Sequence, residues 1–149
     1  MSDADLIKLY SGRILELADN IPPTARLDRP QATVKKLSPL CGSTVTVDLS
    51  TERGRISAYG QDVKACALGQ AAAAVVGANI IGRTRAEVET ARDQLKAMLK
   101  SGGPVPDAPF DGLEVLLPAR DFKNRHASIM LTLEAAAEAI AQAENAACA

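Results

Sequence analysis

The sequence predicts an α+β protein in which helices cover one face of a small antiparallel sheet of about three strands. Apolar residues recur with a period near 3.6 in several stretches, as in amphipathic helices, and with a period of two between Thr44 and Tyr59, as in half-buried strands. The helical and strand stretches are segregated along the chain and do not alternate as βαβ units. This order favours an antiparallel sheet with helices packed on it.

The first predicted helix covers residues 3–19. Pro22-Pro23 ends it, because proline lacks the amide hydrogen that a helix needs. Residues 24–32 are polar, contain a further proline and are predicted to be irregular. The apolar positions of the helix form one stripe of a 3.6-residue repeat: Leu6, Tyr10, Ile14 and Leu17.

Residues 44–49 and 55–63 are predicted to pair as an antiparallel hairpin. Both stretches alternate apolar and polar residues, and Thr51-Glu52-Arg53-Gly54 between them is typical of a turn. Residues 33–38 are predicted to add a third strand. Three side chains on one face of the hairpin are expected to be buried against the last helix: Val45, Val47 and Leu49.

Two helices are predicted after the hairpin. The alanine-rich stretch from Cys66 to Gly77 forms a tightly packed helix, and Thr84 and Glu87 form a capping box at the start of the next one. Gly102 is predicted to end this second helix, because glycine commonly follows the last helical residue. The buried stripe of this second helix comprises Val88, Ala91, Leu95 and Met98.

A loop and a last helix complete the predicted fold. Residues 102–109 contain two glycines and three prolines and are predicted to be a loop. The last helix is predicted to begin between Lys123 and Ala127, and the whole chain, 1–149, to form one domain. The side chains of this helix that face inward are Ile129, Leu133, Ala136 and Ile140.

The composition excludes several classes of protein. The net charge of −1 and an aromatic content of 3% argue against a nucleic-acid partner, which requires a basic surface or a stacking platform. Apolar runs fall short of the roughly 20 residues that span a bilayer, so no membrane partner is expected. The acidic start Met1 to Asp5 resembles no targeting signal, and we expect a cytoplasmic protein.

The hairpin brings two of the three cysteines together. If its turn is centred between residues 52 and 53, Cys41 lies opposite Lys64, two residues before Cys66. A bulge at Gly60 would change this by about one residue. The two thiols are therefore expected at the same end of the hairpin. In a reducing compartment, such thiols serve as metal ligands, catalytic groups or small buried hydrophobes.

The surroundings of these residues suit a soft metal. Cys41 lies in a loop before Gly42, and Cys66 opens a helix, where free amide groups favour a thiolate. His126, the only histidine, lies at the start of the last helix. Two thiolates and an imidazole form a soft-metal site with an open fourth position. The alternatives are a buried hydrophobic cysteine and a capping histidine, and Cys148 in the tail is taken as incidental.

Five segments carry a resemblance to a known family, and they occur in its order. They are Tyr10-Ser11, Pro39-Leu40-Cys41-Gly42, Tyr59 to Ala73 (YGQDVKACALGQAAA), Leu117-Pro118-Ala119-Arg120 and Arg125-His126-Ala127-Ser128-Ile129. Together they resemble the U-type iron–sulfur cluster assembly scaffolds (IscU, NifU N-terminal and SufU-like proteins) over almost the whole chain. The resemblance implies the α+β fold of the SufE/NifU-like proteins.

The resemblance also implies a function that is not enzymatic. Such a scaffold receives sulfur from a cysteine desulfurase, assembles a cluster, usually [2Fe–2S], and passes it to recipient apo-proteins; it can also hold zinc. Cys41 and Cys66 match the first two cysteine ligands of the family. Ser43 stands where the family usually carries an acidic residue.

The third cysteine of the family is missing. One register matches His-Cys-Ser-Ile to His126-Ala127-Ser128-Ile129 and puts Ala127 in its place. Another matches Lys-Cys-Ala-Thr to residues 125–128 and puts His126 there. In both registers His126 is the remaining donor. The expected ligand set for a cluster, iron or zinc is therefore Cys41, Cys66 and His126, and loss of any one should abolish stoichiometric metal.

Two other functions are compatible with the sequence. The first is a zinc-bound regulator or docking partner of a cysteine desulfurase without scaffold activity. The second is a two-cysteine thiol redox enzyme that uses Cys41 and Cys66 as attacking and resolving thiols. The colour and metal content of the protein purified without oxygen distinguish the three functions.

Overall fold

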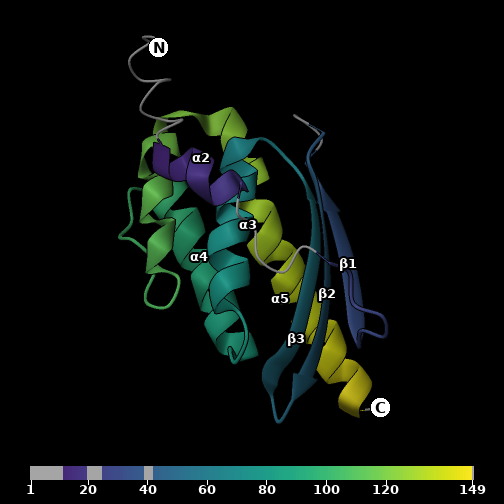
Figure 1. Ribbon diagram of the computed structural model, residues 1–149. Coiled ribbons are helices and arrows are strands. Elements are labelled where there is room, and N and C mark those ends of the chain that lie inside the picture. The colour runs from purple at the N-terminus through teal and green to yellow at the C-terminus, as the bar shows by residue number, and fades with distance from the viewer. Residues whose placement is uncertain (1–11, 20–24, 39–41, 149) are drawn as a thin grey trace.

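The computed structural model describes residues 12–19, 25–38 and 42–148 (Figure 1). Three β-strands form one antiparallel sheet in the order β1-β2-β3. In chain order, the elements are α2 (Gly12–Asp19), β1 (Ala32–Leu37), β2 (Thr44–Glu52), β3 (Arg55–Lys64), α3 (Ala67–Asn79), α4 (Arg85–Lys100), the 3₁₀ segments η1 (Asp111–Asp121) and η2 (Lys123–Arg125), and α5 (His126–Cys148).

The predicted α+β fold is confirmed. The helices lie on one side of the sheet, and the long helix α5 runs beside it in contact with β1 and β2 (Figure 1). Val45, Val47 and Leu49 of β2 are fully buried. Alternate side chains of a strand point to the same face, so these three line the side that the helices cover. The inward residues predicted for α5 are buried as well: Ile129, Leu133, Ala136 and Ile140.

The hairpin has a different register from the predicted one. Thr44, and not Cys41, pairs with Lys64, so the strands are displaced by three residues. The turn is centred between Arg53 and Gly54, whose φ angles are 55° and 77°, as the right-handed twist of a tight hairpin requires. The predicted turn centre lay one residue earlier, and moving the centre by one residue moves each pairing partner by two positions. A register shift between Ser50 and Thr51 adds one more, and Gly60 pairs regularly with Asp48.

The helices after the hairpin begin where the sequence predicts. Thr84 and Glu87 form the capping box of α4: the Thr84 hydroxyl accepts from the Glu87 amide, and the Glu87 carboxylate accepts from the Thr84 amide, both at 3.2 Å. No helix in the described part of the chain combines the length and apolarity needed to cross a membrane.

The 3₁₀ segment η1 was not predicted. It follows the loop assigned from glycine and proline content, and its buried residues Leu113, Leu116 and Ala119 recur every three positions. Three residues per turn is the period of a 3₁₀ helix, so this spacing is the signal that the sequence offered.

The other face of the sheet is crossed by residues 25–27. Asp48 of β2 points to this face and is fully buried. Its carboxylate accepts hydrogen bonds from Arg26 Nε at 2.5 Å, the Leu27 amide at 3.1 Å and the Thr33 hydroxyl at 2.6 Å. Beside it, Gly60 is required because a Cβ there would lie 2.3 Å from the carbonyl oxygen of Ala25.

Replacement of Asp48 by asparagine is expected to destabilise the fold by about 2 kcal/mol at pH 7, since hydrogen bonds to a buried charge contribute roughly 1.5–3 kcal/mol. Burial alone would raise the pKa of Asp48, but the hydrogen bonds from Arg26, Thr33 and Leu27 outweigh burial and lower the pKa below its ordinary value. A lowered pKa gives stability that is present above the unfolded value and lost as the pH falls through the folded value.

Urea unfolding at pH 7 and pH 3 measures this effect. The difference in unfolding free energy between wild type and Asp48→Asn should shrink at pH 3. The matched control is Asp93→Asn, because Asp93 is exposed and pairs with its sequence neighbour Arg92. Its effect should stay within about 0.5 kcal/mol. Equal effects of the two substitutions would contradict this account of Asp48.

Candidate functional site

Three elements converge on the thiol of Cys66. Cys66 immediately precedes α3 and is half-buried, with extended backbone angles (φ −66°, ψ 170°). Its Sγ lies 3.6 Å from the Oγ of Ser128, in the first turn of α5. The Ser128 hydroxyl donates to the Oγ of Ser43, just before β2, at 3.2 Å. We call Ser43, Cys66 and Ser128 the Cys66 cluster.

Gly69 allows α3 and α5 to approach each other at this cluster. A Cβ at Gly69 would lie 2.6 Å from Ser128 Oγ, 2.8 Å from the Cβ of Ala65 and 3.2 Å from the Ser128 carbonyl oxygen. Contacts this short exclude any larger residue unless the helices move apart. A glycine one turn after Cys66 therefore sets the distance between Cys66 and Ser128.

Cys41 lies outside the described residues, so its predicted proximity to Cys66 stays a prediction. The ends of its loop are joined: the Ser38 amide donates to the Ser43 carbonyl, and the Gly42 amide donates to the Ser38 carbonyl, both at 2.8 Å. Ser38 is thus bonded to Ser43, a member of the Cys66 cluster. The Cys41 loop thus begins and ends beside the Cys66 cluster.

His126 is placed away from Cys66. Its imidazole is 2% exposed, and Nε2 lies 2.9 Å from the carbonyl oxygen of Ala119 and 3.1 Å from that of Arg120. Two residues apart on a helix correspond to about 200° of rotation, so His126 and Ser128 point to opposite sides of α5. The structure therefore brings Ser128, and not His126, to Cys66.

Sequence reasoning missed Ser128. The two alignment registers put Ala127 or His126 at the position of the missing cysteine, but the residue that touches Cys66 is Ser128. The helix period offered a signal: residues two positions apart point to different sides of a helix, so His126 and Ser128 cannot both face Cys66. Ser43, which stands where the family usually carries an acidic residue, is bonded to Ser128.

Within residues 12–19, 25–38 and 42–148, no group of three or more His, Cys, Asp or Glu side chains could hold a metal ion. This set does not include Cys41, and the predicted three-donor site stays a prediction. What the cluster offers chemically is one thiol and two buried hydroxyls. Because the Ser128 hydroxyl donates to Ser43, its oxygen can accept a hydrogen bond from the Cys66 thiol or present a lone pair to a bound ion.

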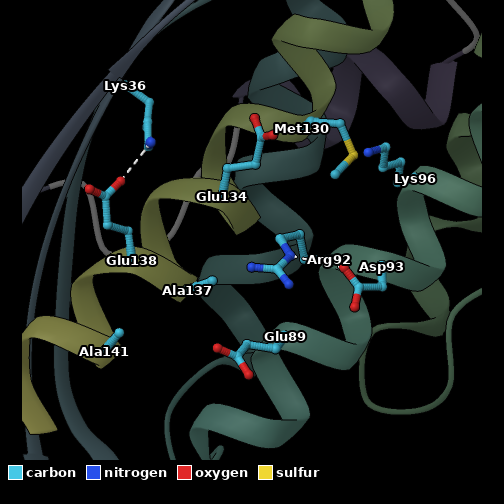
Figure 2. Close-up of a pocket in the computed structure, with 10 residues that line it drawn as sticks. All are labelled: Lys36, Glu89, Arg92, Asp93, Lys96, Met130, Glu134, Ala137, Glu138 and Ala141. Carbon is cyan, nitrogen blue, oxygen red and sulfur yellow. Dashed lines mark hydrogen bonds and ion pairs between the residues drawn. The ribbon is translucent and has the colours of Figure 1, made fainter.

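A charged groove of about 470 Å³ lies between α4 and α5 (Figure 2). Met130 lines it, so the groove is on a different side of α5 from Ser128. Lys36 of β1 pairs with Glu138 of α5 at 2.6 Å, and Arg92 pairs with Asp93 on α4 at 3.0 Å. Because these charges neutralise one another, the groove does not select a ligand of one sign.

Solved structures show what the chain is similar to. The N-terminal part of a nitrogen-fixing NifU-like protein from Brucella abortus is 43% identical, over 95% of this chain and 98% of that one, with a TM-score of 0.92. A putative iron–sulfur cluster assembly scaffold protein for the SUF system from Fervidobacterium islandicum AW-1 is 19% identical, over 89% of this chain and 96% of that one, with a TM-score of 0.80. A hypothetical protein is 20% identical, over 89% and 97%, with a TM-score of 0.79.

The two more distant structures show the fold alone. No protein-family model matches the chain, and no curated protein does. The similarity to the Brucella protein covers nearly the whole of both chains at 43% identity. The chain therefore belongs to the NifU-like N-terminal family, in agreement with the resemblance to U-type scaffolds that the cysteine segments carry.

Proposed function

We propose that the protein is an iron–sulfur scaffold or carrier that holds a [2Fe–2S] cluster, or the iron for one, at Cys66 and passes it to apo-proteins. Membership of the NifU-like family and the fold shared with a putative SUF scaffold support this role. The observation that carries the proposal is the convergence of α3, α5 and the start of β2 on one half-buried thiol.

The position of Cys66 suits the binding of an anionic, sulfur-containing cargo. The first amide groups of a helix have no partner within the helix, and they favour negative charge at its N-terminus. Cys66 lies at that end of α3, and part of it remains open to solvent. A partner protein can thus reach the sulfur without unfolding the core.

Incomplete ligation suits a cargo that must leave. A [2Fe–2S] cluster is usually held by four cysteine thiolates, whereas this chain offers Cys66 and, from the adjoining loop, Cys41. Ser128 provides an oxygen in contact range of the Cys66 sulfur. Coordination positions not filled by this chain are open to thiolates of an acceptor, so ligand exchange can transfer the cluster.

The sulfur donor that this role requires is a cysteine desulfurase. Ser128 cannot accept a persulfide sulfur because a hydroxyl does not form one, so sulfur would arrive at Cys41 or Cys66. In this proposal the protein turns over no small substrate and is not an enzyme. It works by binding and handing on its cargo.

The hydroxyl at Ser128 also favours a second candidate function. A protein without a third thiol can bind zinc and dock on a desulfurase without assembling clusters. Zinc accepts sulfur, nitrogen and oxygen ligands in one tetrahedral site, so the loss of a thiol affects it less. Metal analysis distinguishes the two functions, because a zinc protein contains no sulfide.

Cluster transfer tests the proposed function. The full chain is reconstituted with ferrous iron and sulfide without oxygen, freed of excess reagents and mixed with an apo-ferredoxin. We expect the visible circular dichroism of the ferredoxin to develop faster than with iron and sulfide alone, and to persist when a chelator traps free iron. A rate that the chelator abolishes would contradict the carrier role.

A further inference from the structure

We propose that His126 is a positioning residue that fixes the start of α5 and so holds Ser128 against Cys66. This role rests on the proposed function for its purpose, since Ser128 matters only if Cys66 carries the cargo. It differs from the ligand role that the sequence predicts for His126, because it acts through the backbone and requires no contact with a metal.

The hydrogen bonds of the imidazole define this role. Its Nε2 faces two carbonyl oxygens, of Ala119 and Arg120, which can only accept. Nε2 therefore carries the proton. The Nδ1 atom is buried and has no hydrogen-bond partner among the described residues. The polar contacts of the ring thus all run through Nε2 to the end of η1.

The 3₁₀ segment that His126 contacts is stabilised by hydrogen bonds to other elements. Residues 111–125 form 3₁₀ turns, whose hydrogen bonds have poorer geometry than those of an α-helix. The Arg120 side chain donates to the carbonyls of Met98 at 2.8 Å and Gly103 at 3.4 Å, at the end of α4. Residues 119–120 are therefore tied to α4 by Arg120 and to α5 by His126.

The contact between Ser128 and Cys66 depends on where α5 begins. Ser128 lies two residues after His126, and its Oγ and backbone carbonyl are already close to Gly69 of α3. A small rotation or shift of the first turn would move Ser128 away from the sulfur. Fixing that turn to η1 and α4 is thus a way to keep the Cys66 cluster assembled.

A disulfide reporter tests this proposal without iron or sulfide. In a full-length background carrying Ser128→Cys, Cys41→Ser and Cys148→Ser, the thiol pair at positions 66 and 128 is equilibrated with glutathione. The equilibrium gives an effective concentration of one thiol at the other. We expect His126→Leu to lower this concentration at least about tenfold, and His126→Gln, whose amide nitrogen can reach the same carbonyls, to keep it within about threefold.

Two further variants separate positioning from general destabilisation. Val88→Ala removes buried volume near the start of α4, about ten residues from the end that Arg120 contacts, and should lower stability without changing the effective concentration. His126→Asn, whose shorter amide cannot reach both carbonyls, should behave like His126→Leu and replaces it if the leucine variant does not fold.

An unchanged effective concentration in His126→Leu would overturn the proposal. If that variant does not fold, the same result in His126→Asn would overturn it. An equally large drop in the Val88→Ala variant would also overturn it. Because the assay contains no cluster, its result is independent of the transfer experiment.

Discussion

Cys66→Ser is expected to abolish cargo binding. After reconstitution, the variant should retain less than about a tenth of the wild-type iron and sulfide. The serine hydroxyl is nearly isosteric with the thiol but does not ionise at neutral pH, and clusters are held by thiolates. Changes to residues that only support a ligand weaken metal binding by about 10–100-fold, so loss of the ligand itself should exceed this range.

The matched control for this prediction is Cys148→Ser. It removes a thiol as well, but from the last residues of α5, 82 positions further along the chain. Iron and sulfide per chain, together with the visible spectrum, should match those of the wild type. If Cys66→Ser bound as much cluster as Cys148→Ser, Cys66 would not be the point of attachment and the proposed function would lose its basis.

Gly69→Val is expected to destabilise the protein by about 2–4 kcal/mol. The first carbon of any side chain at this position would come within 3.0 Å of Ser128 Oγ and of Ala65 Cβ. Overpacking of a buried contact costs about 1–3 kcal/mol, occasionally more, and a branched side chain adds two further carbons. Urea unfolding of wild type and variant measures the loss.

Two comparisons show that the loss arises at the contact with α5. Ala78→Val places the same residue at an exposed position of α3 and should cost less than about 1 kcal/mol, which reflects helix propensity alone. In the milder variant Gly69→Ala, adding Ser128→Ala removes the oxygen at 2.6 Å and should restore part of the stability. If the two substitutions were strictly additive, Ser128 would not be the group that Gly69 accommodates.

Most of the fold could be predicted from local patterns. The alternation in β2 and β3, the capping box of Thr84 and Glu87, and the stripe on α5 are all encoded in short stretches, and each element appears where its pattern predicts. The hairpin register was wrong because it depends on the handedness of a two-residue turn and on an irregularity at Ser50 and Thr51. Neither feature leaves a mark in the hydrophobic period.

The candidate site was predictable in part. The position of Cys66 was predictable because the alanine-rich stretch that forms α3 begins at this residue, directly after the predicted hairpin. The choice between Ser128 and His126 depends on how α5 is rotated against α3. That rotation is set by the fit of Gly69 and by the backbone contacts of His126, which are tertiary features. A serine inside a helix also carries no chemical signature of its own.

The composition of the protein purified without oxygen shows whether it carries an iron–sulfur cargo. Iron, sulfide and zinc are measured per chain together with the visible absorption spectrum. We expect a brown protein that contains iron and acid-labile sulfide in equal amounts, and Cys66→Ser should be colourless. A colourless wild-type protein with one zinc per chain and no sulfide would contradict it, as would a metal-free protein that consumes peroxide.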